Sequence, residues 1–438
     1  MYSKKIIEQL QKRKVKIGNE ISIVVESKEY KGVLLDNPEL NSEILIIKLN
    51  SGYNIGLEFN DSIKFVSNGH SFSEKHEPEI KNKDYDISVL TFGGTISSKV
   101  EYTTGAVYPS ISNKEFMEQF PELNNYGKIN FKKIFSILSE DINVTHWKEM
   151  GKEIHAQLKE NKPVVATHGT DTMSYSSSAV SFMIQNPTNP VVFTGSQRSS
   201  DRGSSDNKEN ILNSVYYAKN GIPGVYVCMH KNSNDGQGVI INGTRARKMH
   251  TSKRDAFKSI NSQPVANIDY KTNTIDYISQ PKTKGKMKFN DSFNENVAML
   301  YIHPGIKPSL VSKLNDYDGV VLIGTGLGHV PSNPFNDKLS LPIFNEIKEL
   351  IDSNVPVVMS SQTIYGRLNM NVYTVGRMLK EIGVIGHLCD WTPETAYVKL
   401  SWVLGQTKDM NKVTEMMHTN YCGEFSERIV YENEEVEQ

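Results

Sequence analysis

Two short glycine-bearing segments place threonine hydroxyls directly after β-branched apolar runs. They are residues 91–96 (TFGGTI) and residues 167–173 (THGTDTM). A threonine becomes a nucleophile only when a neighbour takes its proton and the backbone aims its hydroxyl at a carbonyl, and glycine permits the close backbone approach that this requires. Two such turns in one chain predict a site that cleaves an amide.

The residues around each turn suggest different roles. Thr95, after two glycines, is a candidate nucleophile, but a phosphate-binding glycine loop or a helix N-cap has the same pattern. The second turn places Asp171 beside Thr170, where a carboxylate can bind a substrate ammonium or hold a lysine that acts as a base. Lys248, expected in a loop after the apolar run 239–241, is one candidate among several basic residues there.

The elements that must position these turns are strands of a parallel sheet. Apolar runs alternate with helical patterns, which is typical of a parallel sheet covered by helices on both faces. The expected strands are residues 87–92, 133–138, 164–167, 191–194 and 225–229. Ligands bind such sheets at the carboxyl ends of the strands, and both threonine turns fall there.

Further elements lie on either side of this sheet. A second α/β set follows, with expected strands at residues 297–302, 319–323 and 355–360. Before the sheet, five short β-branched runs predict a small antiparallel barrel: residues 21–25, 30–35, 44–49, 53–59 and 63–66. Residues 1–16 predict a basic amphipathic helix, whose cations either contact RNA phosphates or form a solvated face.

We therefore predict five segments. They are a basic helix and barrel (1–70), a polar linker (71–85), a catalytic domain (86–285), a smaller C-terminal α/β domain (293–425) and an acidic tail (429–438). A length of 438 residues suits two or three domains.

Composition excludes several classes of function. The net charge of −1 demands no polyanionic or membrane partner for the chain as a whole. The three cysteines are far apart, which argues against a zinc ribbon and a disulfide framework and predicts reduced thiols in the cytoplasm. The charged N-terminus and the lack of a long apolar window predict neither export nor membrane insertion, and we expect no bound metal.

Four motifs, in order, resemble those of the two-domain bacterial-type L-asparaginases over about residues 86–420. They are residues 91–96, 167–173, 194–198 (TGSQR) and 242–259, which end in DAFKS. The resemblance implies an asparaginase-like two-domain α/β fold, here preceded by the barrel. It also implies that Thr95 is the acylated nucleophile, assisted by Tyr102, and that Thr170, Asp171 and Lys248 form a second triad. Both threonines remain candidates for the first attack.

The same resemblance implies a set of substrate-binding residues. Ser139 and Glu140 match the family's contacts to the α-carboxylate and α-ammonium groups, and a hydroxyl and an acid suit a zwitterionic substrate. The alternative is that residues 139–141 (SED) only signal the start of a helix. Gly94 and Ser196, within the matching motifs, complete the expected set. His168 is expected to orient its turn.

Residues 1–85 have no counterpart in ordinary asparaginases, and this architecture resembles GatD, the glutaminase family of the archaeal glutamyl-tRNA(Gln) amidotransferases. The resemblance implies hydrolysis of glutamine, or asparagine, to supply ammonia to the partner protein GatE, where ATP and Mg²⁺ activate glutamate on the tRNA. It implies no cofactor on this chain. The implied partners are GatE, Glu-tRNA(Gln) through the complex, and a second copy in a homodimer within a heterotetramer.

Two alternatives belong to different classes. One is a free-standing L-asparaginase whose barrel only aids oligomerisation. The other is a catalytically inactive amino-acid sensor. The presence of Thr95, Thr170, Asp171 and Lys248 together argues against the sensor, which has no need of all four.

Overall fold

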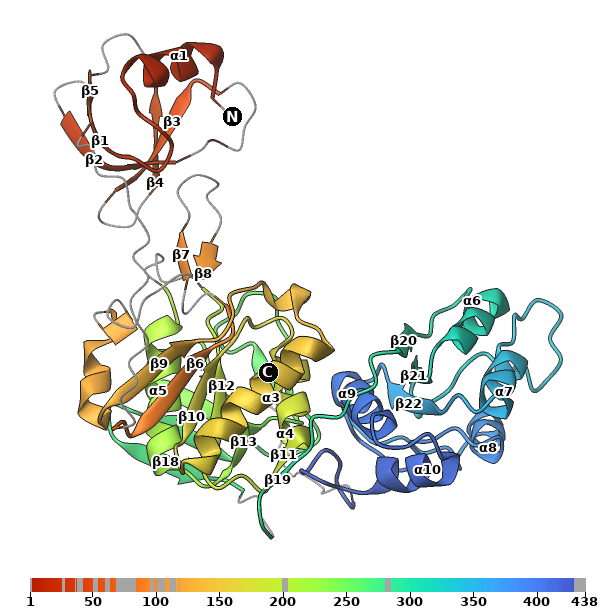
Figure 1. Ribbon diagram of the computed structural model, residues 1–438. Coiled ribbons are helices and arrows are strands. Elements are labelled where there is room, and N and C mark those ends of the chain that lie inside the picture. Colours follow the sequence, from red (N-terminus) through yellow and green to blue (C-terminus); the bar gives the residue numbers. More distant parts are fainter. Residues whose placement is uncertain are drawn as a thin grey trace.

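The computed structural model describes residues 2–25, 28–35, 37, 42–49, 54–59, 64–67, 84–94, 98–100, 107–109, 116–117, 119–198, 204–279 and 285–428. The chain forms a small N-terminal β unit, a large sheet flanked by helices, and a smaller α/β unit (Figure 1). Most of the predicted linker (71–85) and the predicted tail (429–438) lie outside the described residues, as do Thr95 and Tyr102.

The N-terminal unit is an antiparallel sheet packed against one helix. Its elements are α1 (Lys4–Lys12), β1 (Glu20–Val25), β2 (Lys28–Leu34), β3 (Ile44–Leu49), β4 (Asn54–Glu58) and β5 (Lys64–Ser67). The strand order is β4-β3-β2-β1-β5, so each of the five predicted strands has its counterpart. Ile6 and Leu10 of α1 are buried against the sheet, which leaves the lysines of α1 exposed.

The large sheet has eight strands among the described residues. They are β6 (Ile87–Thr91), β9 (Ile129–Lys133), β10 (Val164–Thr167), β12 (Pro190–Thr194), β13 (Gly224–His230), β14 (Gln237–Asn242), β17 (Ala266–Asp269) and β18 (Thr274–Tyr277), in the order β18-β17-β14-β13-β12-β10-β6-β9. Strands β9, β6, β10, β12 and β13 are parallel as predicted. The other three are antiparallel, so the sheet is mixed.

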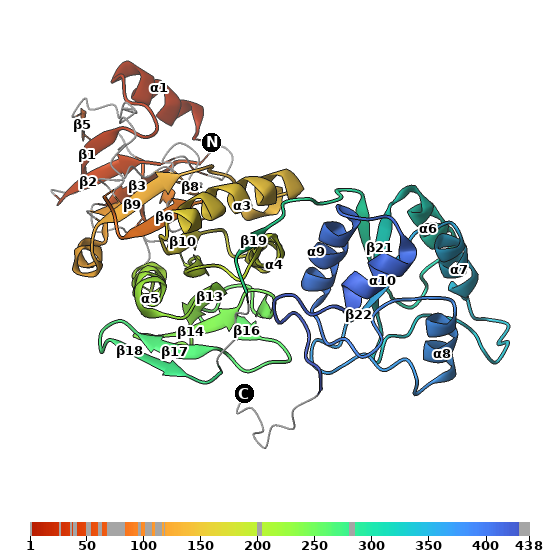
Figure 2. The same ribbon diagram turned by 60° about the horizontal axis from the view of Figure 1, so that its bottom comes forward.

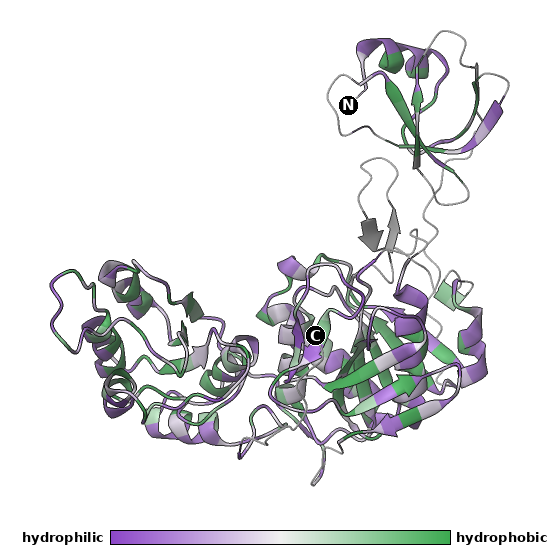
Figure 3. Ribbon diagram, turned by 180° about the vertical axis from the view of Figure 1, so that it is seen from behind, coloured by the Kyte–Doolittle hydropathy of each residue, from purple (hydrophilic) through white to green (hydrophobic). Residues whose placement is uncertain are grey.

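Helices cover both faces of this sheet. They are α3 (Val144–Lys159), α4 (Met173–Met183) and α5 (Asn207–Asn220). Leu90 belongs to the core that includes α3 and α4, whereas its neighbour Val89 belongs to the core that includes α5, because successive side chains of a strand point to opposite faces. Seen from behind, the central strands are accordingly hydrophobic (Figure 3).

One predicted strand is misplaced. The apolar run at residues 133–138 predicts a strand, but the strand is β9, and residues 134–138 have no regular structure. Ile134 and Phe135 pack against the core beyond the end of the sheet, whereas Leu138 is exposed. An apolar run thus indicates that part of a segment is buried. It does not show that the segment has a neighbouring strand with which to pair.

The C-terminal unit is a parallel sheet with helices. Its elements are β20 (Val297–Tyr301), α6 (Pro308–Ser312), η4 (Lys313–Asp316), β21 (Gly319–Gly324), α7 (Phe344–Asp352), β22 (Val357–Ser361), α8 (Thr374–Glu381), α9 (Pro393–Leu404) and α10 (Met410–His418). Helix α9 packs against α4 of the large unit (Figure 2). Within the described ranges, no helix has the length and apolar character needed to cross a membrane.

Short elements complete the framework. They are β7 (Ser98–Val100) paired with β8 (Val107–Pro109), the 3-10 helices η2 (Pro121–Tyr126) and η3 (Ser139–Asp141), β11 (Ile184–Gln185) paired with β19 (Lys288–Phe289), and β15 (Ala246–Lys248) paired with β16 (Phe257–Ser259).

Candidate active site

Three parallel strands end side by side at one edge of the large sheet. Thr167 at the end of β10 is in register with Thr91 of β6 and Thr194 of β12. Two backbone hydrogen bonds extend the pairing, from the Phe92 amide to the Thr167 carbonyl and from the His168 amide to the Thr194 carbonyl, each 2.9 Å long. The two threonine turns therefore leave the sheet next to each other.

Glycine allows these turns to touch. Gly94 has a φ of +87°, and a Cβ atom there would lie 2.6 Å from the carbonyl carbon of His168 and 2.7 Å from the amide nitrogen of Gly169. Any larger residue would separate the turns, because backbone atoms cannot move aside as a flexible side chain can. Gly94, predicted to contact substrate, thus has a first role in joining the two turns.

The second turn brings three predicted residues together. The Nζ atom of Lys248 donates hydrogen bonds to Thr170 Oγ1 at 2.9 Å and to Asp171 Oδ1 at 2.6 Å. Thr170 and Lys248 are largely enclosed, with 8% of Thr170 and 14% of the Lys248 side chain exposed, whereas 67% of the Asp171 side chain faces solvent. The amine can therefore exchange a proton with the threonine hydroxyl, while the carboxylate stays accessible to a ligand.

The structure corrects the setting of Lys248. The sequence predicts a loop, but Lys248 ends strand β15, which pairs with β16. Two neighbours anchor this strand to the C-terminal unit. Arg245 is buried with Asp390 at 3.1 Å, and Arg247 lies 3.3 Å from Glu394. These long-range pairs hold the backbone of the β15–β16 hairpin in place. The long Lys248 side chain therefore extends toward Thr170 from a fixed position.

His168 orients the second turn, as predicted. It is buried, and its Nδ1 and Nε2 atoms lie 2.6 Å from the Gly169 carbonyl and 2.8 Å from Ser176 Oγ. A carbonyl only accepts, so Nδ1 carries the hydrogen and Nε2 accepts from Ser176, which itself accepts from Trp147 Nε1 at 3.2 Å. Burial lowers the pKa of His168 from 6.5 to about 4, so the ring is neutral. Both ring nitrogens are engaged in hydrogen bonds that hold the turn.

This burial makes folding sensitive to acid. Because the pKa of His168 is lower in the folded state, its contribution to stability is complete above pH 6.5 and is lost as the pH falls toward 4, to an extent of about 3 kcal/mol. In His168→Gln we expect the free energy of unfolding in urea to change less steeply between pH 6.5 and 4.5, by up to about 1.4 kcal/mol per pH unit. Identical slopes for parent and variant would contradict the assignment.

The segment that carries Ser139 and Glu140 lies against the second turn. A Cβ atom on Gly169 would lie 2.6 Å from that of Ser139, and Thr172 Oγ1 donates to the Ser139 carbonyl at 2.6 Å. Residues 139–141 form a short 3-10 helix of their own, and Asn143 caps the helix α3 that follows, so the helix-start alternative applies only to this 3-10 turn. Ser139 is buried and Glu140 is exposed, and their roles toward substrate stay predictions.

Ser196 lies in the loop after β12 and has partners within the protein. Its hydroxyl contacts the Arg198 carbonyl and lies 2.8 Å from Asp206 Oδ1. Asp206 itself is fully buried. The structure therefore uses Ser196 to shape this loop, and its contact with substrate stays a prediction. The sequence analysis missed Asp206 and Thr172, for which the only local signal is a polar residue beside a turn.

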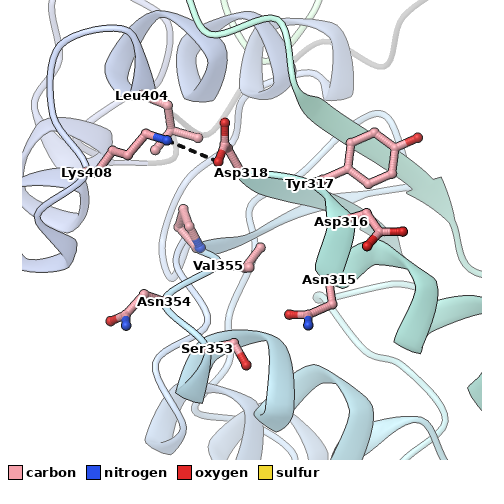
Figure 4. Close-up of a pocket in the computed structure, with 10 residues that line it drawn as sticks. Asn315, Asp316, Tyr317, Asp318, Ser353, Asn354, Val355, Leu404 and Lys408 are labelled. Atoms are coloured by element: carbon pink, nitrogen blue, oxygen red, sulfur yellow. Dashed lines mark hydrogen bonds and ion pairs between the residues drawn. The ribbon is translucent and has the colours of Figure 1, made fainter.

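A separate cavity lies in the C-terminal unit. It has a volume of about 310 Å³ and is lined by residues of the C-terminal unit, with Asp318 and Lys408 paired at 3.2 Å (Figure 4). Asp318 and Val355 precede β21 and β22, so the cavity is at the amino ends of these strands. None of its lining residues belongs to the threonine turns or to β15, so the cavity is no part of the threonine site.

The fold and the site define an asparaginase-type amidohydrolase. Family models agree: the N-terminal asparaginase model matches residues 86–283, the glutaminase/asparaginase C-terminal domain model matches residues 296–417, and the GatD N-terminal domain model matches residues 15–66. The structure resembles the thermostable L-asparaginase from Thermococcus kodakarensis, with a TM-score of 0.71 and 31% identity over 78% of this chain and 99% of that one.

The chain is also similar over nearly its whole length to proteins that carry the additional N-terminal part. It is 41% identical to the GatD protein of the glutamyl-tRNA(Gln) amidotransferase of Methanobrevibacter smithii, over 96% of each chain. It is 39% identical to GatD of Pyrococcus furiosus, over 96% of this chain and 98% of that one. The chain belongs to the GatD family of glutamyl-tRNA(Gln) amidotransferases.

Proposed function

We propose that this chain hydrolyses glutamine, or asparagine, to supply ammonia to a complex that converts Glu-tRNA(Gln) to Gln-tRNA(Gln). The observation that supports hydrolysis is the contact of Lys248 Nζ with Thr170 Oγ1 and Asp171 Oδ1 in a member of the GatD family. A sensor that only binds an amino acid would not require this arrangement of amine, hydroxyl and carboxylate.

The proposed reaction proceeds through an ester. The Thr95 oxygen attacks the side-chain carboxamide carbon while Tyr102 assists removal of the hydroxyl proton, and this proton passes to the leaving nitrogen. The C–N bond breaks, the nitrogen gains a proton and ammonia leaves. Water then cleaves the ester, which releases the free acid and restores the threonine. In this scheme Thr170 and Lys248 move the protons, and if Thr170 attacks first the same bonds form and break on its oxygen.

The substrate is a zwitterion, and the proposed contacts match its charges. Asp171 and Glu140 would face the α-ammonium group, and Ser139 would meet the α-carboxylate, with Gly94 and Ser196 completing the pocket. Helix α4 begins at Met173, directly after the second turn, so the positive end of its dipole favours negative charge developing near Thr170. We propose no cofactor on this chain, and ATP and Mg²⁺ would act at the partner protein.

Ammonia release must be coupled to its use. Free ammonia is largely protonated at neutral pH and is then not a nucleophile, so it must pass to the second site by a closed route. We therefore propose a cytoplasmic complex with GatE, with this chain as a homodimer in a heterotetramer. The exposed lysines of α1 are candidate contacts for the tRNA or for GatE.

One assay tests this proposal. Ammonia release from glutamine and from asparagine would be measured with the chain alone, with GatE, and with GatE plus Glu-tRNA(Gln). We expect release to rise when the charged tRNA is added, and the uncharged tRNA serves as the control. Strong release by the chain alone that the tRNA does not change would contradict the proposal, and no release in any mixture would favour the sensor.

A further inference from the structure

A buried series of side chains connects the end of β13 to the loop behind Thr170. His230, the last residue of β13, has its Nδ1 atom 2.7 Å from Asn210 Oδ1. Asn210, on α5, donates through Nδ2 to the Gly195 carbonyl and to Asp206 Oδ2, both at 2.9 Å. His230 and Asn210 are each 1% exposed, so water does not compete for these hydrogen bonds.

Asp206 accepts further hydrogen bonds from the loop after β12 and so holds several of its residues in place. Its Oδ1 atom accepts hydrogen bonds from Ser196 Oγ at 2.8 Å and from the Arg198 amide at 3.0 Å. Its Oδ2 atom accepts from the Gln197 amide at 3.0 Å, besides Asn210. These four donors, with no cation among them, satisfy a fully buried carboxylate, so the loop conformation depends on all of them.

The anchored loop touches the catalytic turn. A Cβ atom on Gly195 would lie 2.6 Å from the His168 carbonyl oxygen and 2.8 Å from the Cγ2 methyl of Thr170. The Gly195 backbone therefore limits where that methyl group can lie. Because methyl and hydroxyl share the same Cβ atom, holding the methyl also sets the direction of Oγ1 toward Lys248.

The hydrogen-bond partners fix the orientation of every group in this series. The Asn210 amide nitrogen faces two oxygens, those of Gly195 and Asp206, so its amide oxygen must face His230. His230 must therefore carry a hydrogen on Nδ1 to donate to Asn210. A leucine at position 230 would leave the Asn210 oxygen buried without a donor, which favours rotation of the amide and loss of its hold on Gly195.

On its other side, His230 meets an acid that is already neutralised. Its Nε2 atom lies 3.1 Å from Glu209 Oε2, and Glu209 also accepts from Lys271 Nζ at 2.7 Å and from the Gly236 amide at 2.6 Å. Burial alone would raise the pKa of Glu209, but the close contact with His230 and the hydrogen bonds from Lys271 and the Gly236 amide outweigh it and lower the pKa to about 2.

A metal ion is the other ligand that this cluster suggests. Glu209, His230 and Asp235 offer ligand atoms within 4.8 Å of one another. However, Glu209 pairs with Lys271 and Asp235 pairs with Arg254, so two protein cations already balance the two acids. A divalent ion would have to displace them, and the arrangement favours a structural network over a metal site.

We propose that His230 and Asn210 are positioning residues for amide hydrolysis, holding Gly195 against Thr170 so that its hydroxyl points at Lys248. This inference rests on the proposed hydrolytic function. It makes the rate depend on the Nδ1 hydrogen of His230, although no atom of His230 is in contact with the catalytic triad in the described structure.

Replacement of His230 by asparagine and by glutamine distinguishes the contribution of Nδ1 from that of Nε2. The shorter asparagine amide would occupy the place of Nδ1 and keep the donor to Asn210, whereas a glutamine amide would reach the place of Nε2 and lose it. We expect His230→Asn to retain most of kcat, and His230→Gln and His230→Leu to lower kcat about tenfold to a hundredfold with little change in KM. The control is His155→Leu, because His155 stacks on Phe289 away from Gly195.

A double-mutant cycle tests whether the two residues act together. Asn210→Ala should lower kcat at least as much as His230→Leu, and the double variant should lose no more than Asn210→Ala alone. Fully additive losses, or equal kcat values for the asparagine and glutamine variants, would overturn the inference. So would one bound zinc per chain, measured by elemental analysis after dialysis against zinc and then buffer, if it were lost in His230→Asn.

Failure of this inference and failure of the proposed function give different results. All variants are compared with the parent on whichever amide the parent hydrolyses, so an error in the amide donor changes no ratio. A parent that hydrolyses neither amide in any mixture would contradict the proposed function. A parent-like kcat in His230→Leu would contradict only the positioning role.

Discussion

Replacing Thr170 with valine should abolish ammonia release, lowering kcat by at least about a thousandfold. Valine keeps the methyl group that packs against Gly195 and removes only the oxygen that Lys248 contacts at 2.9 Å. The loss therefore reports the hydroxyl and not the packing. Ammonia release at saturating glutamine, with GatE and Glu-tRNA(Gln) present, is the measurement, and Thr95→Val should be equally inactive.

The chain offers a matched control three residues earlier. Thr167 is fully buried, and its Oγ1 atom has no hydrogen-bond partner in the described part of the structure. Thr167→Val therefore exchanges an unsatisfied hydroxyl for a methyl group and should leave both kcat and stability near those of the parent. A near-normal rate in Thr170→Val, with its folding intact by circular dichroism, would show that the catalytic role of Thr170 is misassigned.

Removing the buried amine of Lys399 should cost about 3 to 5 kcal/mol of unfolding free energy. Lys399 and Glu424 are fully buried and lie 2.7 Å apart. The Lys399 Nζ atom also donates to the carbonyls of Met417 and Thr419, at 2.8 and 2.6 Å, so all three of its hydrogens are used. In Lys399→Met, the Glu424 carboxylate would remain buried without its cation.

Urea unfolding measures this effect. Glu424→Gln should also destabilise the fold, and the double variant should lose less than the sum of the two single losses, because neither charge is then left alone. The control is Lys348→Met, which removes one partner of an exposed pair with Asp352 and should cost less than about 1 kcal/mol. A Lys399→Met variant as stable as this control would contradict the assigned role.

The Lys399 pair also supports the active site. Glu424 accepts hydrogen bonds from the amides of Tyr421 and Cys422 and so shapes the segment that follows α10. The Gly423 carbonyl in this segment accepts from Arg245 Nε at 2.8 Å, three residues before Lys248. Stability in the C-terminal unit and the placement of the proposed base in the large unit thus depend on the same few residues.

The local pattern of apolar and polar residues predicted most of the strands. The run at residues 164–167 coincides with β10, and the runs in residues 21–66 match the strands of the N-terminal unit within a few residues. These patterns succeed because alternation and apolar runs report burial along a strand, which is a local property. They fail at residues 134–138, where Ile134 and Phe135 are partly buried against the core although the segment forms no strand.

The sequence by itself also predicted the chemistry: two glycine-bearing threonine turns at strand ends with Asp171 beside the second, and the resemblance to asparaginases selected Lys248 among the nearby basic residues. Only the tertiary structure decided that Lys248 stands on a hairpin held by Arg245 and Asp390, and that His230 supports Thr170 through Asn210. The physical reason is that a buried polar residue must find its partner across the fold, at a separation in sequence that no local pattern records.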